Sequence, residues 1–336
     1  MKHSAALAME TVLIERTGKV GYITLNRPRA LNSLTLDMIR RIHAGIKEHE
    51  SNTDVEVIVI RTNEKRAFCA GGDMKATRDM ALAENWQGLR SFFAEEYALN
   101  LHISECAKPY VSLVPGIAMG GGLGLTVHGS VMVVSDSTKL AMPETAIGFF
   151  PDVGGTHFLS RLPFEAGLWL GFTGVPISGQ EAVALGLATH FIDESYWDDL
   201  CEHLEQQGSK HLSESLNAWA SRVEDITAGE SSERYHLRAA WFSADTDSEL
   251  LRNLQDAAAE NQDAEKLLKR MHSVSPYAVS YTRKLLKKAA TMSLKDCLAM
   301  ELKAADEMVR HPDFIEGIRA VLVDKDQAIW TSSYPA

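Results

Sequence analysis

Apolar and polar residues alternate along two short stretches near the N-terminus, residues 11–16 and 20–25, with a turn between them. This alternation is typical of a β-hairpin. The next segment changes to helical spacing, since apolar residues recur every three or four positions over about 36–50. We expect a helix there, with the Thr35 side chain as its N-cap.

Short runs of β-branched residues follow, and such runs favour buried strands. The predicted strands are residues 55–60, 110–114 and 131–135, with a last short strand within 186–192. From about residue 195 onward the pattern predicts an almost wholly helical chain, in which the polar segment 243–250 is a linker. Helices are expected within 276–310 and over 314–323.

Glycine-rich segments come directly after two of these strands, at residues 67–73 and 115–124. Exposed backbone N–H groups in such segments can hold a developing oxyanion without any side chain. Two alternatives need no ligand: a turn that requires positive φ, and close helix packing on small residues. Neither segment matches the dinucleotide fingerprint or the P-loop, so a nucleotide site of those kinds is not indicated.

Two carboxylates, Glu144 and Asp152, lie eight residues apart in the otherwise apolar stretch 141–156. Prolines and glycines interrupt this stretch, so no regular element is predicted. An acid carried into an apolar setting loses hydration and its pKa rises, which suits acid–base work near neutral pH. The alternative is two loop acids that face water, or an Asp152 that caps a helix.

A third acid, Glu96, falls on or beside the apolar face of a helix predicted over 89–101. Buried acids are usually paired. Glu96 is therefore expected either to contact a ligand or to form a salt bridge with a residue such as Arg90.

Composition narrows the classes of function. The chain has 336 residues, 45% of them hydrophobic, and a net charge of −11. This charge argues against nonspecific binding to nucleic acid or to acidic membranes. The four cysteines are widely spread without metal-site spacing, so reduced thiols and no metal site are predicted. With no signal-peptide pattern and no long apolar run, we expect a cytoplasmic protein.

Four short motifs appear in order over about 120 residues, and together they resemble the crotonase (enoyl-CoA hydratase/isomerase) superfamily. They are Asn26-Arg-Pro with Ala30-Leu-Asn32, Ala67-Phe-Cys-Ala-Gly-Gly-Asp73, Pro115-Gly-Ile-Ala-Met-Gly-Gly-Gly122, and Pro143-Glu144. The resemblance implies an α/β fold, a spiral of ββα units that forms two roughly perpendicular sheets, closed by C-terminal helices. We accordingly predict a core with the active site over 1–200 and a helical region over 201–336.

Three further stretches resemble the branch of this superfamily that hydrolyses 3-hydroxyisobutyryl-CoA in valine degradation. They are residues 92–97, residues 143–155 and the tail 316–327. Hydratases of the family carry a first catalytic glutamate three residues after the central glycine of the GGG run, where this chain has Gly124. Glu144 matches the second glutamate. The usual two-glutamate hydration is therefore not indicated, whereas the hydrolase pattern with Asp152 is met.

The resemblance assigns roles to individual residues. Glu144 would attack the thioester or activate water, and Asp152 would orient it or protonate the departing thiolate. The N–H groups of Ala70 and Gly121 would form the oxyanion hole. The substrate-binding positions implied are Glu96, Gly71, Gly72, Asp73 and Gly120. The CoA-binding positions implied are Arg27, Arg29, Ala30 and Lys325.

The resemblance also sets expectations for ligands and partners. CoA would enter as part of an acyl-CoA substrate and no separate cofactor is expected, while a homo-oligomer is possible because the superfamily often forms trimers or hexamers. Two other functions are compatible with the motifs. One is an enoyl-CoA hydratase or isomerase with altered acids, and the other is a non-catalytic acyl-CoA-binding protein.

Overall fold

The computed structural model describes residues 10–223 and 229–334. Their chain forms two compact units, each assembled from separate stretches of sequence. Unit 1 comprises residues 1–72, 98–140 and 177–224, and unit 2 comprises residues 73–97, 141–176 and 225–336. The division into a core over 1–200 and a helical region over 201–336 stays a prediction.

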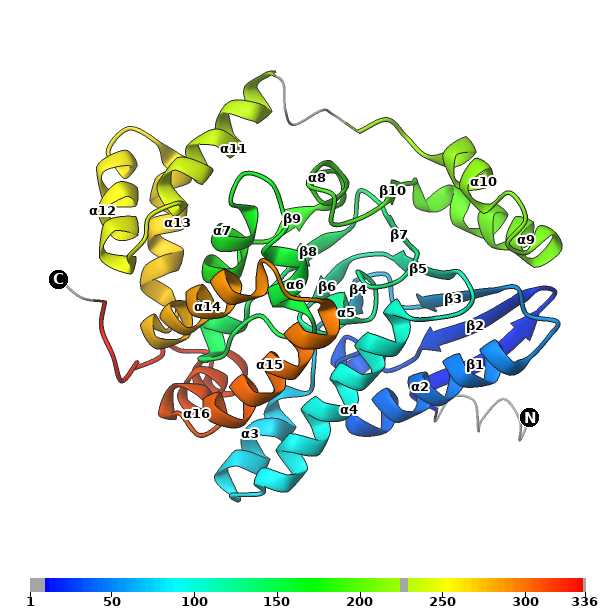
Figure 1. Cartoon of the computed structure of the whole chain (residues 1–336), viewed down its shortest axis with the longest axis horizontal. Coiled ribbons are helices and arrows are strands. Elements are labelled where there is room, and N and C mark those ends of the chain that lie inside the picture. The colour runs from blue at the N-terminus through cyan, green and yellow to red at the C-terminus, as the bar shows by residue number, and fades with distance from the viewer. Residues whose placement is uncertain (1–9, 224–228, 335–336) are drawn as a thin grey trace. The chain divides into compact units, whose positions relative to one another are not determined.

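A six-stranded sheet forms the centre of unit 1 (Figure 1). Its order is β1 (Val12–Thr17), β2 (Val20–Leu25), β3 (Val57–Thr62), β5 (Tyr110–Val114), β7 (Val131–Val134) and β10 (His190–Phe191). The first pair is antiparallel, which confirms the predicted hairpin, and the other neighbours are parallel. Strands buried on both faces read as continuous apolar runs, as the β-branched runs of β3, β5 and β7 do.

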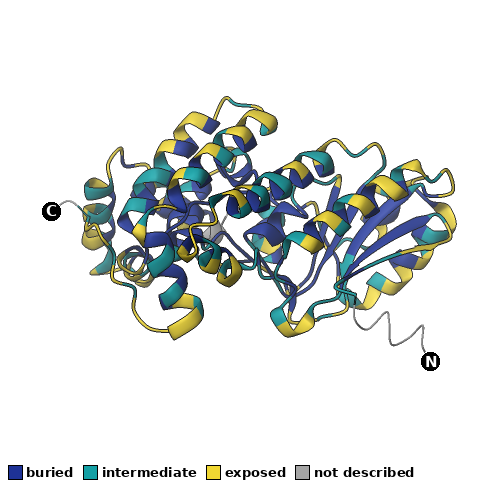
Figure 2. Ribbon diagram, turned by 90° about the horizontal axis from the view of Figure 1, so that it is seen from below, coloured by how far each residue is buried: buried dark blue, intermediate teal, exposed yellow. Residues whose placement is uncertain are grey.

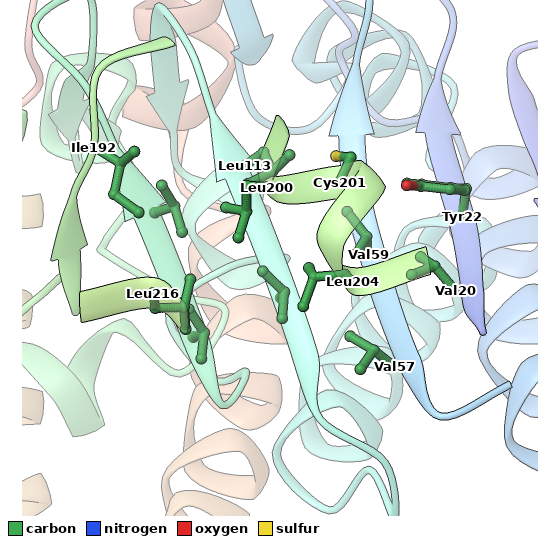
Figure 3. Close-up of a cluster of buried hydrophobic side chains, with 13 residues drawn as sticks. Val20, Tyr22, Val57, Val59, Leu113, Ile192, Leu200, Cys201, Leu204 and Leu216 are labelled. Atoms are coloured by element: carbon green, nitrogen blue, oxygen red, sulfur yellow. The ribbon is translucent and has the colours of Figure 1, made fainter. Parts of the chain in front are cut away.

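Helices pack on this sheet through their apolar faces. α2 (Leu36–Ser51) packs on the hairpin, and the Thr35 hydroxyl accepts a bond from the Met38 N–H at 3.2 Å, as predicted. α9 (Trp197–Gln207) and α10 (Leu212–Trp219) contribute to a cluster of buried apolar side chains that also includes strand residues (Figure 3).

A second, four-stranded sheet joins strands too short to be predicted from the sequence. Its order is β4 (Ala67–Cys69), β6 (Ile117–Met119), β8 (Lys139–Ala141) and β9 (Ile177–Ser178). β4 and β6 are parallel neighbours, so the glycine-rich segments that follow them leave the sheet at the same edge. The remaining short helices of unit 1 are η1 (Pro28–Ala30), α5 (Gly121–Gly124), α8 (Gly179–Ala184) and η3 (Glu194–Tyr196).

Unit 2 is built from helices, and α4 (Trp86–Ser104) contributes its first residues to it. The others are α3 (Met74–Leu82), η2 (Glu144–Ile147), α6 (Gly155–Leu159), α7 (Ala166–Thr173), α11 (Gly229–Phe242), α12 (Asp247–Ala258), α13 (Gln262–Ser273), α14 (Pro276–Ala289), α15 (Leu294–Met308), α16 (Pro312–Ile318) and the π-helix η4 (Arg319–Asp324). Buried positions fill the strands and recur along one side of the helices (Figure 2).

The helical character predicted after residue 195 is confirmed for the described residues, but its details differ. The segment 243–250 is not a linker throughout, because Thr246 caps α12, which begins at Asp247. The periodic segment 276–310 contains two helices, and Ser293 caps the second. Among the described residues, no helix combines the length and apolar character that crossing a bilayer would need.

Candidate active site

The glycine-rich segments after β4 and β6 meet through their backbones in unit 1. Gly71 has a φ of +97°, and Gly120, which precedes α5, has a φ of +50°. A Cβ atom built on Gly122 would lie 2.4 Å from the Cys69 carbonyl oxygen. Both ligand-free explanations therefore hold at this place, since the chain needs positive φ and close approach. The same packing brings the Gly71 backbone next to the Gly121 nitrogen, 3.7 Å from a Cβ built on Gly71.

The prediction that the Ala70 N–H donates to the oxyanion is wrong in this conformation. Its N–H donates to the Leu31 carbonyl oxygen at 3.0 Å, so it is already used. The N–H groups of Gly72 and Gly121 donate to no backbone carbonyl among the described residues. Gly121 stays a candidate donor, and Gly72 is the better partner for it on the β4 side.

The buried side-chain amide of Asn32 anchors the loop whose Leu31 carbonyl oxygen accepts from the Ala70 N–H. The Asn32 Nδ2 donates to the Phe68 carbonyl oxygen at 2.9 Å and to the Thr62 hydroxyl at 2.8 Å. Its Oδ1 accepts from the Arg27 N–H at 2.8 Å. Asn32 was part of the resembling motif, but its anchoring role is visible only in the structure.

The residues expected to bind CoA divide between the two units. Arg27, Arg29 and Ala30 lie in or beside η1 in unit 1. The Arg27 guanidinium donates to the Ser33 carbonyl oxygen at 2.8 Å and to its hydroxyl at 2.9 Å, whereas Arg29 is exposed. Lys325 is exposed in unit 2, at the end of η4. All four assignments stay predictions.

Replacing Gly71 by Ala should lower turnover of the thioester that the resemblance implies as substrate by about 10- to 100-fold, because a misplaced oxyanion donor carries a cost of this order. The new Cβ would lie 3.1 Å from the Met119 carbonyl oxygen beside the Gly121 amide. Gly186→Ala is the matched control, since Gly186 has a φ of +77° but no atom within 4 Å. Both variants should lose stability, and equal loss of activity in both would contradict a special role for Gly71.

Unit 2 gathers four acids, Glu96, Glu144, Asp152 and Glu301, which we call the carboxyl cluster. Their exposed fractions are 2%, 7%, 6% and 0%, respectively. No Lys, Arg or His among the described residues forms a salt bridge with any of them. Because acids without a cationic partner are costly to bury, such a cluster is typical of a site where charge is used.

The structure decides between the alternatives stated above for Glu144, Asp152 and Glu96. Glu144 is the first residue of η2, and Asp152 lies in the loop before α6; both are buried, so they do not face water. Asp152 does not cap α6, since that position is Gly154. Glu96 forms no salt bridge with Arg90, which pairs with Asp306 instead.

Hydrogen bonds distinguish the four acids. The Tyr97 hydroxyl donates to Asp152 Oδ2 at 2.7 Å. Glu301 accepts three bonds from residues 154 and 156. Glu96 Oε1 and Glu144 Oε2, in contrast, are buried without a hydrogen-bond partner among the described residues. These two oxygens are therefore the ones best able to accept a proton or a substrate group.

Burial is the main cause of the shifted pKa values. It raises the pKa of Asp152 to about 7, while the bond from Tyr97 opposes the rise. Burial also raises the pKa of Glu96, with the Asp152 charge adding to it. The pKa of Glu144 is raised by burial and then by Asp152 and Glu96. Since the three acids interact, they titrate as a group and not as independent sites.

Aromatic packing holds the loop that carries Asp152. Phe93 of α4 stacks on Phe149, with ring centroids 5.3 Å apart and an interplanar angle of 20°. Phe149 also contacts Phe150 at 4.5 Å and Phe314 of α16 at 5.6 Å. The aromatic residues that made 141–156 look apolar are thus buried and fix this loop against α4 and α16.

Of the other predicted substrate-binding positions, Gly71, Gly72 and Gly120 lie in the glycine-rich segments of unit 1. Asp73 belongs to unit 2, where its side chain accepts from the Ala76 N–H at 3.4 Å as the N-cap of α3. Its substrate role stays a prediction. No group of three metal-binding side chains occurs within residues 10–223 and 229–334.

Asp152→Asn should stabilise the protein more at pH 8 than at pH 5. The unfolded aspartate ionises near pH 4, whereas folded Asp152 keeps its proton up to about pH 7, so stability falls as pH rises through this window. Each pH unit is worth about 1.4 kcal/mol, so the gain should differ by about 2–3 kcal/mol. Urea unfolding at both pH values measures it. Asp263→Asn should destabilise the protein instead, because Arg238 lowers the pKa of Asp263 and burial does not overcome this.

Two members of this site were not assigned a role from the sequence, Tyr97 and Glu301. Tyr97 was noted as part of an apolar helix face and as the last residue of the resembling stretch 92–97. Glu301 lies on the buried face of α15, among Leu298, Ala305 and Met308. An acid on an apolar helix face is the same signal that singled out Glu96, so the position could have been found in this way.

Comparisons with known proteins agree over nearly the whole chain. A family model described as "Enoyl-CoA hydratase/isomerase" matches residues 20–334. The 3-hydroxyisobutyryl-CoA hydrolase, mitochondrial, of Gallus gallus is 38% identical over 335 residues, covering 97% of this chain and 85% of that protein. The protein of the same name from Homo sapiens is 39% identical over 326 residues, covering 96% and 84%.

Two solved structures have the same fold. A carnitinyl-CoA dehydratase from Mycobacterium thermoresistibile has a TM-score of 0.87 and 36% identity, with 94% of this chain and 90% of that chain covered. An enoyl-CoA hydratase from Rhodobacter sphaeroides 2.4.1 has a TM-score of 0.87 and 34% identity, with 97% and 94% covered.

Proposed function

Because this chain belongs to the enoyl-CoA hydratase/isomerase family, we propose that it hydrolyses the thioester of a short 3-hydroxyacyl-CoA. The favoured substrate is 3-hydroxyisobutyryl-CoA, which would give 3-hydroxyisobutyrate and CoA, a step of valine degradation. The relatives that carry this name in Gallus gallus, Bos taurus and Homo sapiens support the choice. The crotonase-like α/β fold expected from the motifs is confirmed.

One observation carries the proposal: Glu144 and Asp152 are buried as electrostatic neighbours, and Asp152 has a pKa of about 7. An acid that titrates near neutral pH can give up and regain a proton during turnover. At the position of the first hydratase glutamate the chain has Gly124, which cannot exchange protons. The pair available for chemistry is thus the hydrolase pair.

Two routes use this pair. In the first, a Glu144 oxygen bonds to the thioester carbon, the C–S bond breaks to leave a mixed anhydride, and water then cleaves the anhydride. In the second, Glu144 takes a proton from water, whose oxygen bonds to the same carbon. In both, the CoA thiolate takes a proton from Asp152. Main-chain amides of the glycine-rich segments would stabilise the oxyanion.

Glu96 offers a physical reason for a preference for substrates that carry a 3-hydroxyl group. Its Oε1 is buried and has no hydrogen-bond partner among the described residues. A substrate hydroxyl could donate to that oxygen. A site built to bind a hydroxyl discriminates strongly against analogues that lack it, whereas one methyl group is worth only about 1–3 kcal/mol. Rejection of unsubstituted acyl groups should therefore be stronger than discrimination between 3-hydroxyisobutyryl and 3-hydroxypropionyl esters.

The test is free-thiol release from a panel of CoA esters: 3-hydroxyisobutyryl, 3-hydroxypropionyl, isobutyryl and acetyl. The two hydroxyacyl esters should be turned over and the others should not. No thiol release from any ester would refute the proposal. Single turnover in H₂¹⁸O separates the two routes, because label appears in the enzyme carboxylate only after an anhydride.

The second candidate is hydration or dehydration of an acyl-CoA. It is favoured by the names of the two similar solved structures, a dehydratase and a hydratase. Loss of crotonyl-CoA absorbance without free thiol would support it. Tight binding of CoA esters without any turnover would instead support a non-catalytic acyl-CoA-binding protein.

Three accompanying assignments belong to the proposal and rest on the sequence. They are action without a separate cofactor, a cytoplasmic location and a possible homo-oligomer. The names of the relatives describe mitochondrial proteins, so the location is the first of the three to test. Cell fractionation and light scattering of the purified protein address location and oligomeric state.

A further inference from the structure

The Glu301 carboxyl group holds the backbone that follows Asp152. Its Oε2 accepts from the Gly154 N–H at 2.7 Å. Its Oε1 accepts from the Thr156 N–H at 3.0 Å and from the Thr156 hydroxyl at 2.5 Å. Three donors from two residues therefore converge on one fully buried side chain.

The turn held in this way is one that the chain would not adopt readily. Val153 has a φ of +54° and Gly154 a φ of +78°, so two successive residues are left-handed. For a β-branched residue this conformation is a genuine outlier and persists only when its surroundings enforce it. The Gly155 N–H closes the turn by donating to the Asp152 carbonyl oxygen at 2.6 Å.

We propose that Glu301 is a positioning residue: it fixes the 152–156 turn so that the Asp152 carboxyl keeps one orientation toward Tyr97 and Glu144. This inference rests on the proposed function, because the value of a fixed Asp152 is its part in thioester cleavage. Tyr97 holds the carboxyl group from one side, and Glu301 holds the backbone behind it.

Among the described residues, the titratable groups that interact with Asp152 are three carboxyls and one phenol. Glu96 and Tyr97 come from α4, Glu144 from η2, and Glu301 from α15. Burial raises the pKa of Glu301 to about 8, the three hydrogen bonds oppose the rise, and the Asp152 charge adds to it. Replacing Glu301 by Gln loosens the turn, and this changes both the burial of the Asp152 carboxyl and its bond from Tyr97, two factors that set the pKa of Asp152.

The first experiment is a double-mutant cycle on thiol release from 3-hydroxyisobutyryl-CoA. Glu301→Gln should lower kcat by about 10- to 100-fold and change KM by less than about threefold, since misplacing a reacting group affects the chemical step. In an Asp152→Asn background the same change should lower kcat by less than about twofold, because residues that act as a unit are not additive. Full additivity, or a wild-type kcat in Glu301→Gln, would overturn the proposal.

The second experiment does not need turnover. In protein labelled with ¹³C at Asp carboxyls, the signal that titrates near pH 7 is assigned to Asp152 by its loss in Asp152→Asn. Its midpoint should shift in Glu301→Gln and stay unchanged in Asp263→Asn, a control that breaks the ion pair with Arg238 on α11. An unchanged midpoint in Glu301→Gln would overturn the inference.

Failure of the proposed function has a different signature. If the wild type releases no thiol from the panel but the midpoint still shifts in Glu301→Gln, the function is wrong and the positioning stands. Should Glu301→Gln fail to fold, Thr156→Val takes its place, because it removes only the hydroxyl bond. It should lower kcat by about 3- to 10-fold without additivity toward Asp152→Asn, and additivity there would count against the proposal.

Discussion

Replacing Glu144 by Gln should lower kcat for thioester hydrolysis by about 10³- to 10⁴-fold, with little change in binding of the CoA ester. The amide fills the same space but can neither attack the thioester carbon nor take a proton from water. Both routes therefore fail together. Thiol release measures turnover, and calorimetric titration with the unreacted ester measures binding.

Measuring the stability of Glu144→Gln distinguishes a loss of catalysis from a loss of folded protein. Because burial raises the pKa of Glu144, the charged form is disfavoured, and a neutral Gln should leave the folded state at least as stable as the wild type. Glu260→Gln, at an exposed position near the end of α12, is the control for the same chemical change. Full turnover in Glu144→Gln would remove Glu144 from the mechanism.

Replacing Asp152 by Asn should lower kcat by about 100- to 1000-fold and change the pH dependence of kcat. If protonated Asp152 supplies the proton to the departing thiolate, wild-type kcat falls as pH rises through the Asp152 pKa of about 7. Asn cannot supply that proton at any pH. The fall near neutral pH should therefore disappear in the variant.

Measuring kcat from pH 5.5 to 9 tests this assignment. Asp256→Asn, at an exposed position of α12, should reproduce the wild-type profile. A fall near pH 7 that survives in Asp152→Asn would show that another group supplies the proton.

Three members of the carboxyl cluster could be found from the sequence because each stands in an apolar context. Glu96 interrupts the apolar face of a helix, and Glu144 and Asp152 interrupt an apolar loop. Burial without a cationic partner follows from that context. Glu301 carries the same signal on α15, but its role could not be predicted, because its partners are 145 and 147 residues away and helical spacing does not indicate which distant amides an acid will reach.

The error at Ala70 has a different origin. The motif indicates that the segment after β4 approaches the segment after β6, and the structure agrees. Which N–H of the segment is available depends on the Leu31 carbonyl oxygen, which belongs to the loop anchored by Asn32. A choice between neighbouring amides is therefore decided by tertiary contacts that spacing along the chain does not record.

The shortest strands could not be predicted from the pattern of apolar and polar residues. β4 and β6 have three residues each, too few to show alternation, and they form because they pair with neighbouring strands of the four-stranded sheet. The linker predicted over 243–250 was wrong for a similar reason. Its polar residues include Thr246, the N-cap of α12, and the exposed side of that helix.

Glu96 and Glu144 are buried without a cationic partner in the described part of the chain, and this places opposing selective demands on the gene. A change of either codon to one for glutamine would give a protein with higher thermal stability and lower activity. Organisms that need the activity must then offset the deficit with substitutions elsewhere in the chain. Homologues in which these acids are replaced should have higher thermal stability, because selection for the activity no longer maintains the acids.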